Sequence, residues 1–340
     1  MPLLTVVVPA FNAAAYLHRA LTSLKHAPTT VEVLVVNDGS TDTTAEIADS
    51  FASQFPDTYR VIHQRNRGHG GAINAGLDAA RGTYFKVLDA DDWFDADALG
   101  ALLSLLRDME SGGVDAIFTD YVHERAGKAN RTTSFRVALP VGRRFQWGDT
   151  EPFGRRQQLM MHAITFRTDI LRLSGLRLPE NTYYVDNLFV VIPLAHVRSM
   201  YYLPVSLYRY FIGRDDQSVN ADIMVERVDQ QLRVNQIALE TVSPARPATH
   251  GPRPAELSAA LVHHLEAMCA VTSATLARAG TREHLELRHT FWQGIRAENP
   301  WLYARLRRSV LGAGSNLPGA AGRRVTSLAY NVARRVVGFS

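Results

Sequence analysis

Three aspartates lie close together between two hydrophobic stretches of the sequence. Asp89, Asp91 and Asp92 follow residues 84–88, which are apolar or aromatic except for Lys86, and Trp93 and Phe94 come directly after them. Adjacent carboxylates repel one another, and neighbouring aromatic rings limit the water that could screen their charge. A divalent cation would relieve this repulsion, because Mg²⁺ is commonly held by one or two carboxylates together with substrate phosphates. The pattern therefore predicts a ligand site.

A calcium loop and a helix cap are two alternative roles for these carboxylates, and both fit the sequence less well. A continuing strand would place Asp89 and Asp91 on one face, with the small residue Ala90 between them. A calcium-binding loop is excluded, because its sixth position requires glycine and is Phe94 here. Capping of the following helix by Asp91 or Asp92 would account for one aspartate but not three. We therefore favour the ligand site.

The hydrophobic pattern predicts strands that alternate with helices. Strands are expected at 3–8, 31–38, 59–64, 84–89 and 114–122. Helices are expected at 16–24, 39–51, 73–82 and 96–110. This alternation predicts an α/β fold with a Rossmann-like, mostly parallel sheet and helices on both of its faces.

Polar residues follow four of these strands directly. They form the segments Pro9–Asn12, Asn37–Ser40, Asn66–Gly71 and Asp89–Asp92. Ligands of such sheets bind beyond the carboxyl ends of the strands. The four segments are therefore expected to meet at one edge of the sheet and to form a site there.

The glycine-rich segment 66–76 does not complete a known nucleotide fingerprint. G-x-G-x-x-G would need glycine at Ile73, and the chain has no G-x-x-x-x-G-K-[ST] motif. Gly68, Gly70 and Gly71 permit close approach of a ligand to the backbone, or they form a simple turn. The segment 37–42 likewise has two possible roles: it contacts a ligand, or it forms only a turn and a helix cap.

The second half of the chain is expected to become helical. Residues 123–160 are basic and irregular, and helices at 155–173 and 186–197 are followed by a further strand within 199–219. From residue 221 the pattern contains helices only, at 221–241, 255–279, 281–310 and 323–337. We predict two domains, with boundaries at residues 1–220 and 221–340, and a linker at 243–254.

Charge and composition limit the class of protein. The chain has 340 residues and a net charge of +4, yet residues 300–340 contain seven Arg and no acidic residue. This basic tail also carries apolar residues and suits a helix on an anionic membrane surface, or else a solvated appendage or oligomer contact. No nucleic-acid-binding module is found. We predict a cytoplasmic protein, because the chain has one cysteine, an apolar N-terminus that ends at Pro9 and no spanning segment. If the tail binds lipid, the protein would also contact the inner face of the cell membrane.

Together, these motifs resemble family 2 glycosyltransferases with the GT-A fold. The resemblance runs from residue 6 to about residue 219, through "VLVVNDGSTD" and "NRGHGGAINAGLDAARGTYFKVLDADD". It implies a nucleotide-sugar donor, usually of UDP, a Mn²⁺ or Mg²⁺ ion and an acceptor hydroxyl on a cell-envelope glycan, polymer or lipid-linked molecule. The donor-site residues that it implies are Pro9, Ala10, Phe11, Asn12, Asp38, Arg67, Gly70, Gly71, Asn74, Asp89, Ala90 and Asp91.

The resemblance also divides the reactive roles. Asp89–Ala90–Asp91 matches the D-x-D motif, in which Asp91, with Asp89, binds the metal, and Asp92 faces the sugar or acceptor. An inverting transferase needs a general base. Asp186 is the candidate, although Val185 stands where the family often has Glu, and Glu180 is the second choice. Helix capping is the alternative role of Asp186.

Several residues have two possible roles at this point. Arg209, Arg214 and Gln217 are candidates for phosphate or acceptor contacts, or belong to a salt-bridged surface loop. His162 either contacts metal or phosphate or lies satisfied in a helix. A non-catalytic GT-A-like scaffold that binds a nucleotide or glycan is the alternative to an enzyme.

Overall fold

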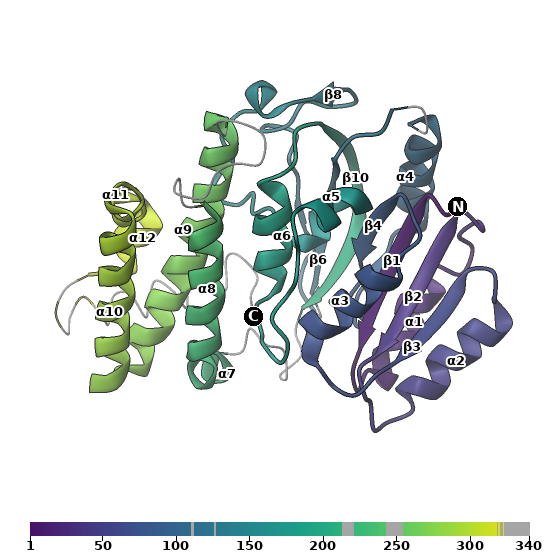
Figure 1. Ribbon diagram of the computed structural model, residues 1–340, viewed down its shortest axis with the longest axis horizontal. Coiled ribbons are helices and arrows are strands. Elements are labelled where there is room, and N and C mark those ends of the chain that lie inside the picture. Colours follow the sequence, from purple (N-terminus) through teal and green to yellow (C-terminus); the bar gives the residue numbers. More distant parts are fainter. Residues whose placement is uncertain are drawn as a thin grey trace. The chain divides into compact units, whose positions relative to one another are not determined.

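The computed structural model describes residues 1–109, 112–125, 127–212, 221–242 and 254–317, together with Gly319 and Gly322. The chain divides into two compact units, Met1–Phe211 (the N-terminal unit) and Ile212–Ser340 (the C-terminal unit). Figure 1 shows an α/β arrangement in the first unit and helices in the second. The predicted boundary after residue 220 stays a prediction, because residues 213–220 lie outside the described part.

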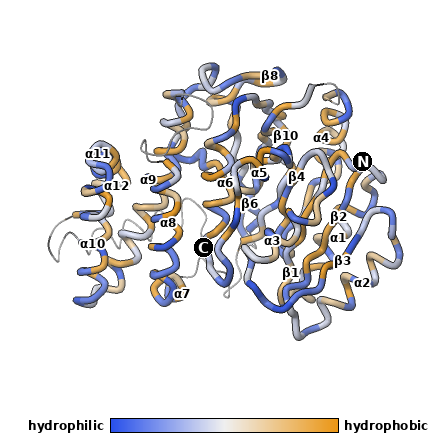
Figure 2. The backbone as a smooth tube through the Cα atoms, in the orientation of Figure 1, coloured by the Kyte–Doolittle hydropathy of each residue, from blue (hydrophilic) through white to orange (hydrophobic). Residues whose placement is uncertain are grey.

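The first half of the central sheet is parallel, as expected. Its strands lie in the order β3 (Tyr59–His63), β2 (Val31–Asn37), β1 (Leu4–Ala10) and β4 (Tyr84–Val87). Every residue of β1 and β2 is buried. Strands covered on both faces need nearly continuous apolar sequence, which explains the runs of Val and Leu and the mostly orange tubes of Figure 2.

The second half makes the sheet mixed. β9 (Ile164–Arg167) lies antiparallel between β4 and β6 (Ala116–Arg125), and β10 (Met200–Ile212) follows. Three short strands complete the sheet: β5 (Trp93–Phe94), β7 (Arg131–Thr133) and β8 (Arg144–Phe145). The expected mostly parallel pairing therefore holds for the first four strands only.

The helix predicted at 155–173 is wrong over most of its length. The structure has a 3₁₀ turn η2 (Met161–Ala163), then β9, and helix α5 only from Thr168 to Leu173. Pairing of β9 with both β4 and β6 overrides the local preference, and the residues of this strand, Ile164, Thr165 and Phe166, have the branched and aromatic character that suits a sheet.

The remaining helices of the N-terminal unit position the strand exits. They are α1 (Ala14–Thr22), α2 (Thr44–Gln54), α3 (Gly68–Ala79), α4 (Ala96–Asp108) and α6 (Asp186–Leu194), with a 3₁₀ turn η1 (Trp147–Asp149). α1 and α2 contact each other, while α3 contacts β1 and β2 on its way from β3 to β4. The connections from β1 to β3 run one way across the sheet, and the connection from β3 to β4 runs back. Since such crossovers are right-handed, α3 covers the face of the sheet opposite to α1 and α2. α3 begins at Gly68, earlier than the predicted start at residue 73, so it includes the glycines of the motif.

The C-terminal unit is helical in its described part. Its helices are α7 (Ala221–Glu226), α8 (Val228–Val242), α9 (Ala255–Ala279), α10 (Arg282–Glu298), α11 (Pro300–Arg308) and α12 (Val310–Gly314). The helix predicted at 281–310 is interrupted at Asn299 and Ser309, where both side chains cap the next helix. The helix predicted at 323–337 lies outside the described residues.

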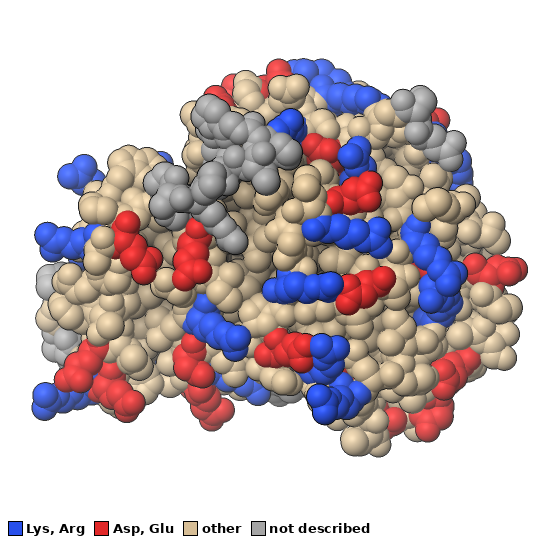
Figure 3. Space-filling model, viewed as in Figure 1, with Lys and Arg blue, Asp and Glu red and all other residues tan. Residues whose placement is uncertain are grey.

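Two further properties of the described chain concern its helices and its surface charge. None of the described helices combines the length and apolar character needed to cross a bilayer. On the face drawn in Figure 3, basic side chains alternate with acidic ones, so the net positive charge is not gathered in one patch there.

Substitution of Gly76 tests the packing of α3 on the sheet. A Cβ atom at Gly76 would lie 2.4 Å from Cγ1 of the fully buried Val7. We expect Gly76→Ala to lower the free energy of unfolding by about 1–3 kcal/mol, because the core must shift. Gly100→Ala in α4 is the matched control, since nothing lies within 4 Å of its Cβ position. It should raise stability by about 0.5–1 kcal/mol through helix propensity. Urea denaturation of both variants measures this, and equal effects would contradict the packing argument.

Candidate functional site

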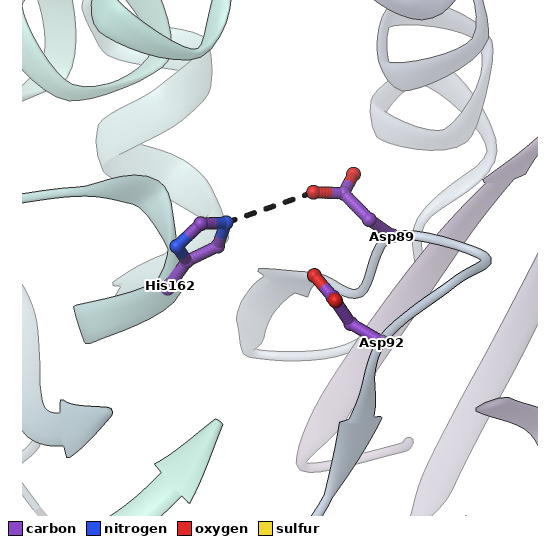
Figure 4. Close-up of side chains that lie close together, drawn as sticks. All are labelled: Asp89, Asp92 and His162. Carbon is purple, nitrogen blue, oxygen red and sulfur yellow. Dashed lines mark ion pairs between the residues drawn. The ribbon is translucent and has the colours of Figure 1, made fainter. Parts of the chain in front are cut away.

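A tight turn at the end of β4 brings two of the three aspartates together. β4 ends at Val87, and the amide N–H of Asp92 donates to the carbonyl of Asp89 at 3.0 Å. The expectation that Asp89 and Asp91 share one face of a continuing strand is wrong, because the strand does not continue. One potential ligand atom from each of Asp89, Asp92 and His162 lies within 4.8 Å of the others, and Figure 4 shows the three side chains facing one space.

The capping alternative for these aspartates is also wrong. Asp95 caps α4, with its Oδ1 accepting the amide N–H of Ala98 at 3.1 Å. The short strand β5 separates Asp91 and Asp92 from that helix. The turn therefore carries two carboxylates, Asp91 and Asp92, that helix capping does not explain.

Asp89 is surrounded by hydrogen-bond donors. Nε2 of His69 lies 2.8 Å from its Oδ1, and Nε2 of His162 lies 3.7 Å from its Oδ2. The hydroxyl of Tyr208 lies 3.3 Å from Oδ2. Burial alone would raise the pKa of Asp89, but the nearby imidazoles of His162 and His69 lower the pKa below its ordinary value. Asp89 is therefore held as a carboxylate.

Asp92 has the opposite protonation tendency. It is fully buried, and its oxygens accept the Tyr208 hydroxyl at 2.8 Å and the Phe211 amide at 2.7 Å. Burial raises the pKa of Asp92 well above its ordinary value, and the charges of Asp91 and Asp89 raise it further. In this structure Asp92 joins the turn to β10. Its predicted contact with sugar or acceptor stays a prediction.

His162 lies in an aromatic stack and not in the helix expected for it. Its ring is 4.3 Å from that of Tyr208 and 4.5 Å from that of Tyr210, measured between centroids. These tyrosines are two positions apart in β10 and so share one face of the strand. The 3₁₀ turn that carries His162 is held by fully buried Lys86, whose Nζ donates to the carbonyls of His162 at 2.9 Å and Ile164 at 3.2 Å. Burial lowers the pKa of Lys86 to about 7.

Asp91 lies at the partly exposed corner of the same turn. Its carbonyl oxygen accepts a hydrogen bond from Arg19 of α1 at 2.6 Å. The guanidinium of Arg19 also lies 3.9 Å from the ring centroid of Trp93. Ala90, between the two D-x-D aspartates, is buried. The turn is thus attached to α1 as well as to β10.

Hydrogen bonds join the strand exits, which confirms their predicted convergence. The amide of Asp38 donates to the carbonyl of Ala10, and the amide of Arg67 donates to Oδ1 of Asp38, both at 2.9 Å. Asn12, in the left-handed region at φ 47°, accepts the amide of Thr41 at 2.8 Å. The bond from His69 to Asp89 completes the series. The predicted donor residues differ in exposure: Pro9, Ala10 and Asp38 are buried, whereas Phe11 and Asn12 are exposed.

The glycines of α3 allow contact with another segment of the protein. A Cβ at Gly70 would lie 2.6 Å from the carbonyl oxygen of Pro179. A Cβ at Gly71 would lie 2.4 Å from Cβ of Arg67. Both ends of the Asn74 amide bond the backbone of Leu178, at 2.8 and 3.0 Å. The observed role of these residues is to hold the loop that precedes α6, and their donor contacts stay predictions.

Asp186 begins α6 but does not cap it. The N-cap position belongs to Val185, and Asp186 accepts a hydrogen bond from Nδ2 of Asn187 at 3.2 Å. Burial raises the pKa of Asp186; the charges of His69 and His162 oppose this rise, and Asp89 adds to it. The charged groups of the Asp89 cluster therefore influence the proton affinity of Asp186. Asp186 therefore does not cap α6, and the capping role considered for it is wrong.

The loop before Asp186 has an unusual backbone. Asn181 and Tyr184 have positive φ values of 49° and 65°. Residues other than glycine rarely adopt this backbone conformation, and where they do they often lie at functional sites. Glu180, the second candidate base, lies in the same loop and forms an ion pair with Arg67, which directly precedes α3. Its carboxylate is therefore already engaged by a cation.

Arg209 is occupied by ion pairs within the protein. Its guanidinium lies 2.6 Å from Asp95 and 3.1 Å from Glu124. Its predicted contact with phosphate or acceptor stays a prediction. Arg214 and Gln217, which were predicted for the same role, lie outside the described residues.

Sequence reasoning missed two residues of the site. His69 carried a usable signal, since it is an ionisable residue inside the polar strand exit 66–71. Tyr208 carried none, because its link to Asp89 and Asp92 depends on tertiary pairing of β10 with β5. A histidine at a strand exit is therefore worth counting among candidate site residues, even where aspartates and glycines surround it.

Comparison with known proteins identifies the class. Residues 5–172 match the family model described as "Glycosyl transferase family 2". EpsH of Bacillus subtilis (strain 168), named as a glycosyltransferase, is 26% identical over 254 residues, which cover 70% of this chain and 67% of EpsH. Further curated relatives are matched over only 10% to 61% of their own length.

Solved structures share the fold. TarS of S. aureus (residues 1–349, in complex with UDP-GlcNAc) is similar with a TM-score of 0.55, 19% identity and 91% coverage of both chains. The mannosyltransferase PcManGT of Pyrobaculum calidifontis, in complex with GDP-Man and Mn²⁺, has a TM-score of 0.53 and 16% identity, covering 96% of this chain and 86% of its own. The family match therefore assigns residues 5–172 to glycosyltransferase family 2, and the fold is GT-A.

Removal of the Tyr208 hydroxyl tests how the turn is held. Tyr208→Phe deletes the group that bonds both Asp89 and Asp92, and should lower the free energy of unfolding by about 1–3 kcal/mol, because a buried carboxyl loses its partner. Tyr210→Phe is the matched control, since the Tyr210 hydroxyl has no hydrogen bond to any residue of the described part while its ring also stacks on His162. Chemical denaturation compares the two. Equal stability of the variants would contradict the bridging role.

Proposed function

We propose that the chain is an inverting glycosyltransferase that moves a sugar from a nucleotide-diphosphate donor to an acceptor hydroxyl. The observation that carries this proposal is the turn bearing Asp89, Asp91 and Asp92 at a strand exit of a family 2, GT-A unit. The half-buried Asp186 at the start of α6 adds a carboxyl group whose pKa responds to the charges of this cluster. Membership of the family supplies the reaction class, and the turn supplies the chemistry that a diphosphate donor requires.

We assign the donor site to the four joined strand exits, and UDP as its nucleotide. The Asp38 carboxylate would accept the imide N–H of uracil, with Pro9, Ala10, Phe11 and Asn12 around base and ribose. Arg67, Gly70, Gly71 and Asn74 would border the nucleotide. TarS binds UDP-GlcNAc and PcManGT binds GDP-Man according to their structures, which supports a nucleotide-sugar of this general kind.

The residues present fit a divalent cation. Asp89, Asp92 and His162 offer two carboxylate oxygens and an imidazole nitrogen within 4.8 Å of one another, a donor set that suits Mn²⁺. Nδ1 of His162 is buried without a partner in the described part of the chain, so Nε2 is the nitrogen directed at the carboxylates. We include Asp91 as a further ligand on the strength of the D-x-D resemblance. When bound, Mn²⁺ or Mg²⁺ neutralises the leaving diphosphate.

We assign Asp186 as the general base. The acceptor oxygen forms a bond to the anomeric carbon while the bond from that carbon to the diphosphate breaks, and Asp186 takes the acceptor proton. A single displacement inverts the anomeric centre. Because burial raises the pKa of Asp186, its carboxylate is a better proton acceptor than an exposed one. Asp92 would contact the sugar or acceptor, and Arg209 the phosphate or acceptor.

We assign the acceptor as a hydroxyl of a cell-envelope glycan, polymer or lipid-linked molecule. The basic, apolar tail of residues 300–340, with seven Arg and no acidic residue, suits an enzyme that works close to an anionic surface. The family resemblance supports a carbohydrate acceptor.

A panel of nucleotide sugars tests the activity. We expect release of UDP with one donor in the presence of Mn²⁺ or Mg²⁺, loss of that release with EDTA, and a large loss in Asp91→Ala. Asp78→Asn is the control, because Asp78 pairs with Arg177 at 2.8 Å on the exposed side of α3. Full activity of Asp91→Ala would contradict the metal role. Donor binding in calorimetry without turnover would instead favour the non-catalytic scaffold.

Asp186→Asn tests the base. We expect kcat to fall by ~10²–10⁴-fold with little change in donor KM, because only proton transfer is lost. Asp186 must be ionised to accept a proton, so kcat/KM of the wild type should rise with pH through a pKa above the ordinary 3.8. This acid limb should be missing in the variant. Glu180→Gln is the comparison; a larger loss there would move the role to Glu180.

A further inference from the structure

One face of α11 is exposed and combines a tryptophan with two arginines. Trp301 is 65% exposed, and Arg305 and Arg308 are also exposed. Residues four and seven positions apart lie on one side of a helix, so the three form a single stripe. Leu302 and Leu306, which are 2% and 1% exposed, hold the other side of the helix to the C-terminal unit.

The orientation of this stripe is well defined within its unit. Oδ1 of Asn299 caps α11 by accepting the amide of Leu302 at 2.9 Å, and Pro300 occupies the first turn. Arg307, between the stripe arginines, instead lies 5.4 Å from the ring centroid of Trp292 and is used inside the unit. The exposed residues are therefore not the ones that hold the helix in place.

Exposed apolar side chains continue beyond the helix. Val310 is 61% and Leu311 38% exposed. Ten large hydrophobic side chains are exposed in the described part of the chain, and Trp301, Val310 and Leu311 are three of them within eleven residues. Scattered exposed apolar residues are normal, but a local concentration indicates an interaction surface.

The charge of the segment selects an anionic partner. Neither Arg305 nor Arg308 forms an ion pair with any residue that the structure describes. Burial raises the pKa of Glu266, and the charge of Arg305 opposes this rise without a direct contact. Residues 300–340 themselves contain no Asp or Glu. Tryptophan beside arginine suits the boundary of a bilayer, where the indole ring enters the headgroup region and guanidinium groups stay at the anionic surface.

We propose that Trp301, Arg305 and Arg308, together with Val310 and Leu311, form a surface that docks on an anionic lipid bilayer. Binding combines insertion of the apolar side chains with attraction of the arginines to lipid headgroups. This docking needs neither nucleotide nor metal. It deepens the proposed acceptor class and rests on the proposed function in that respect, but its test is independent of glycosyl transfer.

Sedimentation of the full chain with vesicles tests the proposal. We expect binding to phosphatidylcholine–phosphatidylglycerol vesicles at low salt, weak binding to phosphatidylcholine alone, and a blue shift of tryptophan fluorescence that Trp301→Phe removes. At ~1 kcal/mol for each basic residue, Arg305→Gln with Arg308→Gln should weaken binding by roughly thirtyfold. Trp301→Ser should weaken it at low and high salt alike.

Matched variants on α10 serve as controls. Leu287→Ser and Arg282→Gln change exposed residues of the same unit outside the stripe, and should leave vesicle binding unchanged. Circular dichroism should show that all variants keep their helices. Equal binding of neutral and anionic vesicles, or unchanged binding of the stripe variants, would overturn the proposal. So would a dimer or a nucleic-acid complex that depends on the stripe while vesicles are not bound.

Discussion

The structure depends on the cost of placing two carboxyl groups, the buried Asp92 and the partly buried Asp89, in one turn. Asp89 and Asp92 lie at the carboxyl end of β4, where burial penalises charge and the charge of Asp89 raises the proton affinity of Asp92. Their neighbours come from three other parts of the chain: His69 from α3, His162 from the turn before β9, and Tyr208 from β10. The order of the strands, β4–β9–β6–β10, is what allows these groups to reach one point. The mixed half of the sheet thus supplies His162 and Tyr208 as partners of the turn at the end of β4.

The two carboxyl groups respond to burial in opposite directions because their partners differ. Asp89 faces two imidazoles, which favour its charged form, whereas Asp92 faces a neutral hydroxyl and a backbone amide beside two negative neighbours. A cation at this point would favour the charged form of both. The site therefore has a built-in preference for positive charge. Burial lowers the pKa of His69, but its bond with Asp89 and the charge of that carboxylate raise the pKa above its ordinary value. The nearby Lys86 contributes position, since its hydrogen bonds go to carbonyl groups.

Much of the fold followed from local sequence, because short, mostly apolar runs that end at turn residues, such as β1 and β2, favour strands covered on both faces. Convergence of the strand exits followed as well, since parallel strands end at one edge. The turn at Asp89–Asp92 did not follow, because a strand and a turn place the same aspartates differently, and the choice is made by Tyr208 and Phe211, more than a hundred residues away. β9 was missed for the same reason, because it is defined by its pairing with β4 and β6, and the sequence around it shows no alternation of apolar and polar residues that predicts a strand.

The environment of each carboxyl also separates positioning from proton transfer. Burial raises the pKa of both Asp92 and Asp186, so proton affinity alone does not distinguish them. Asp92 accepts bonds from Tyr208 and Phe211 of β10, and moving it would release the turn from that strand. Asp186 accepts a bond from its own neighbour Asn187, a contact within α6. Of the two, Asp186 fits the proposed role of general base better, because the hydrogen bond that it accepts from Asn187 lies within α6 and the turn is not held by it.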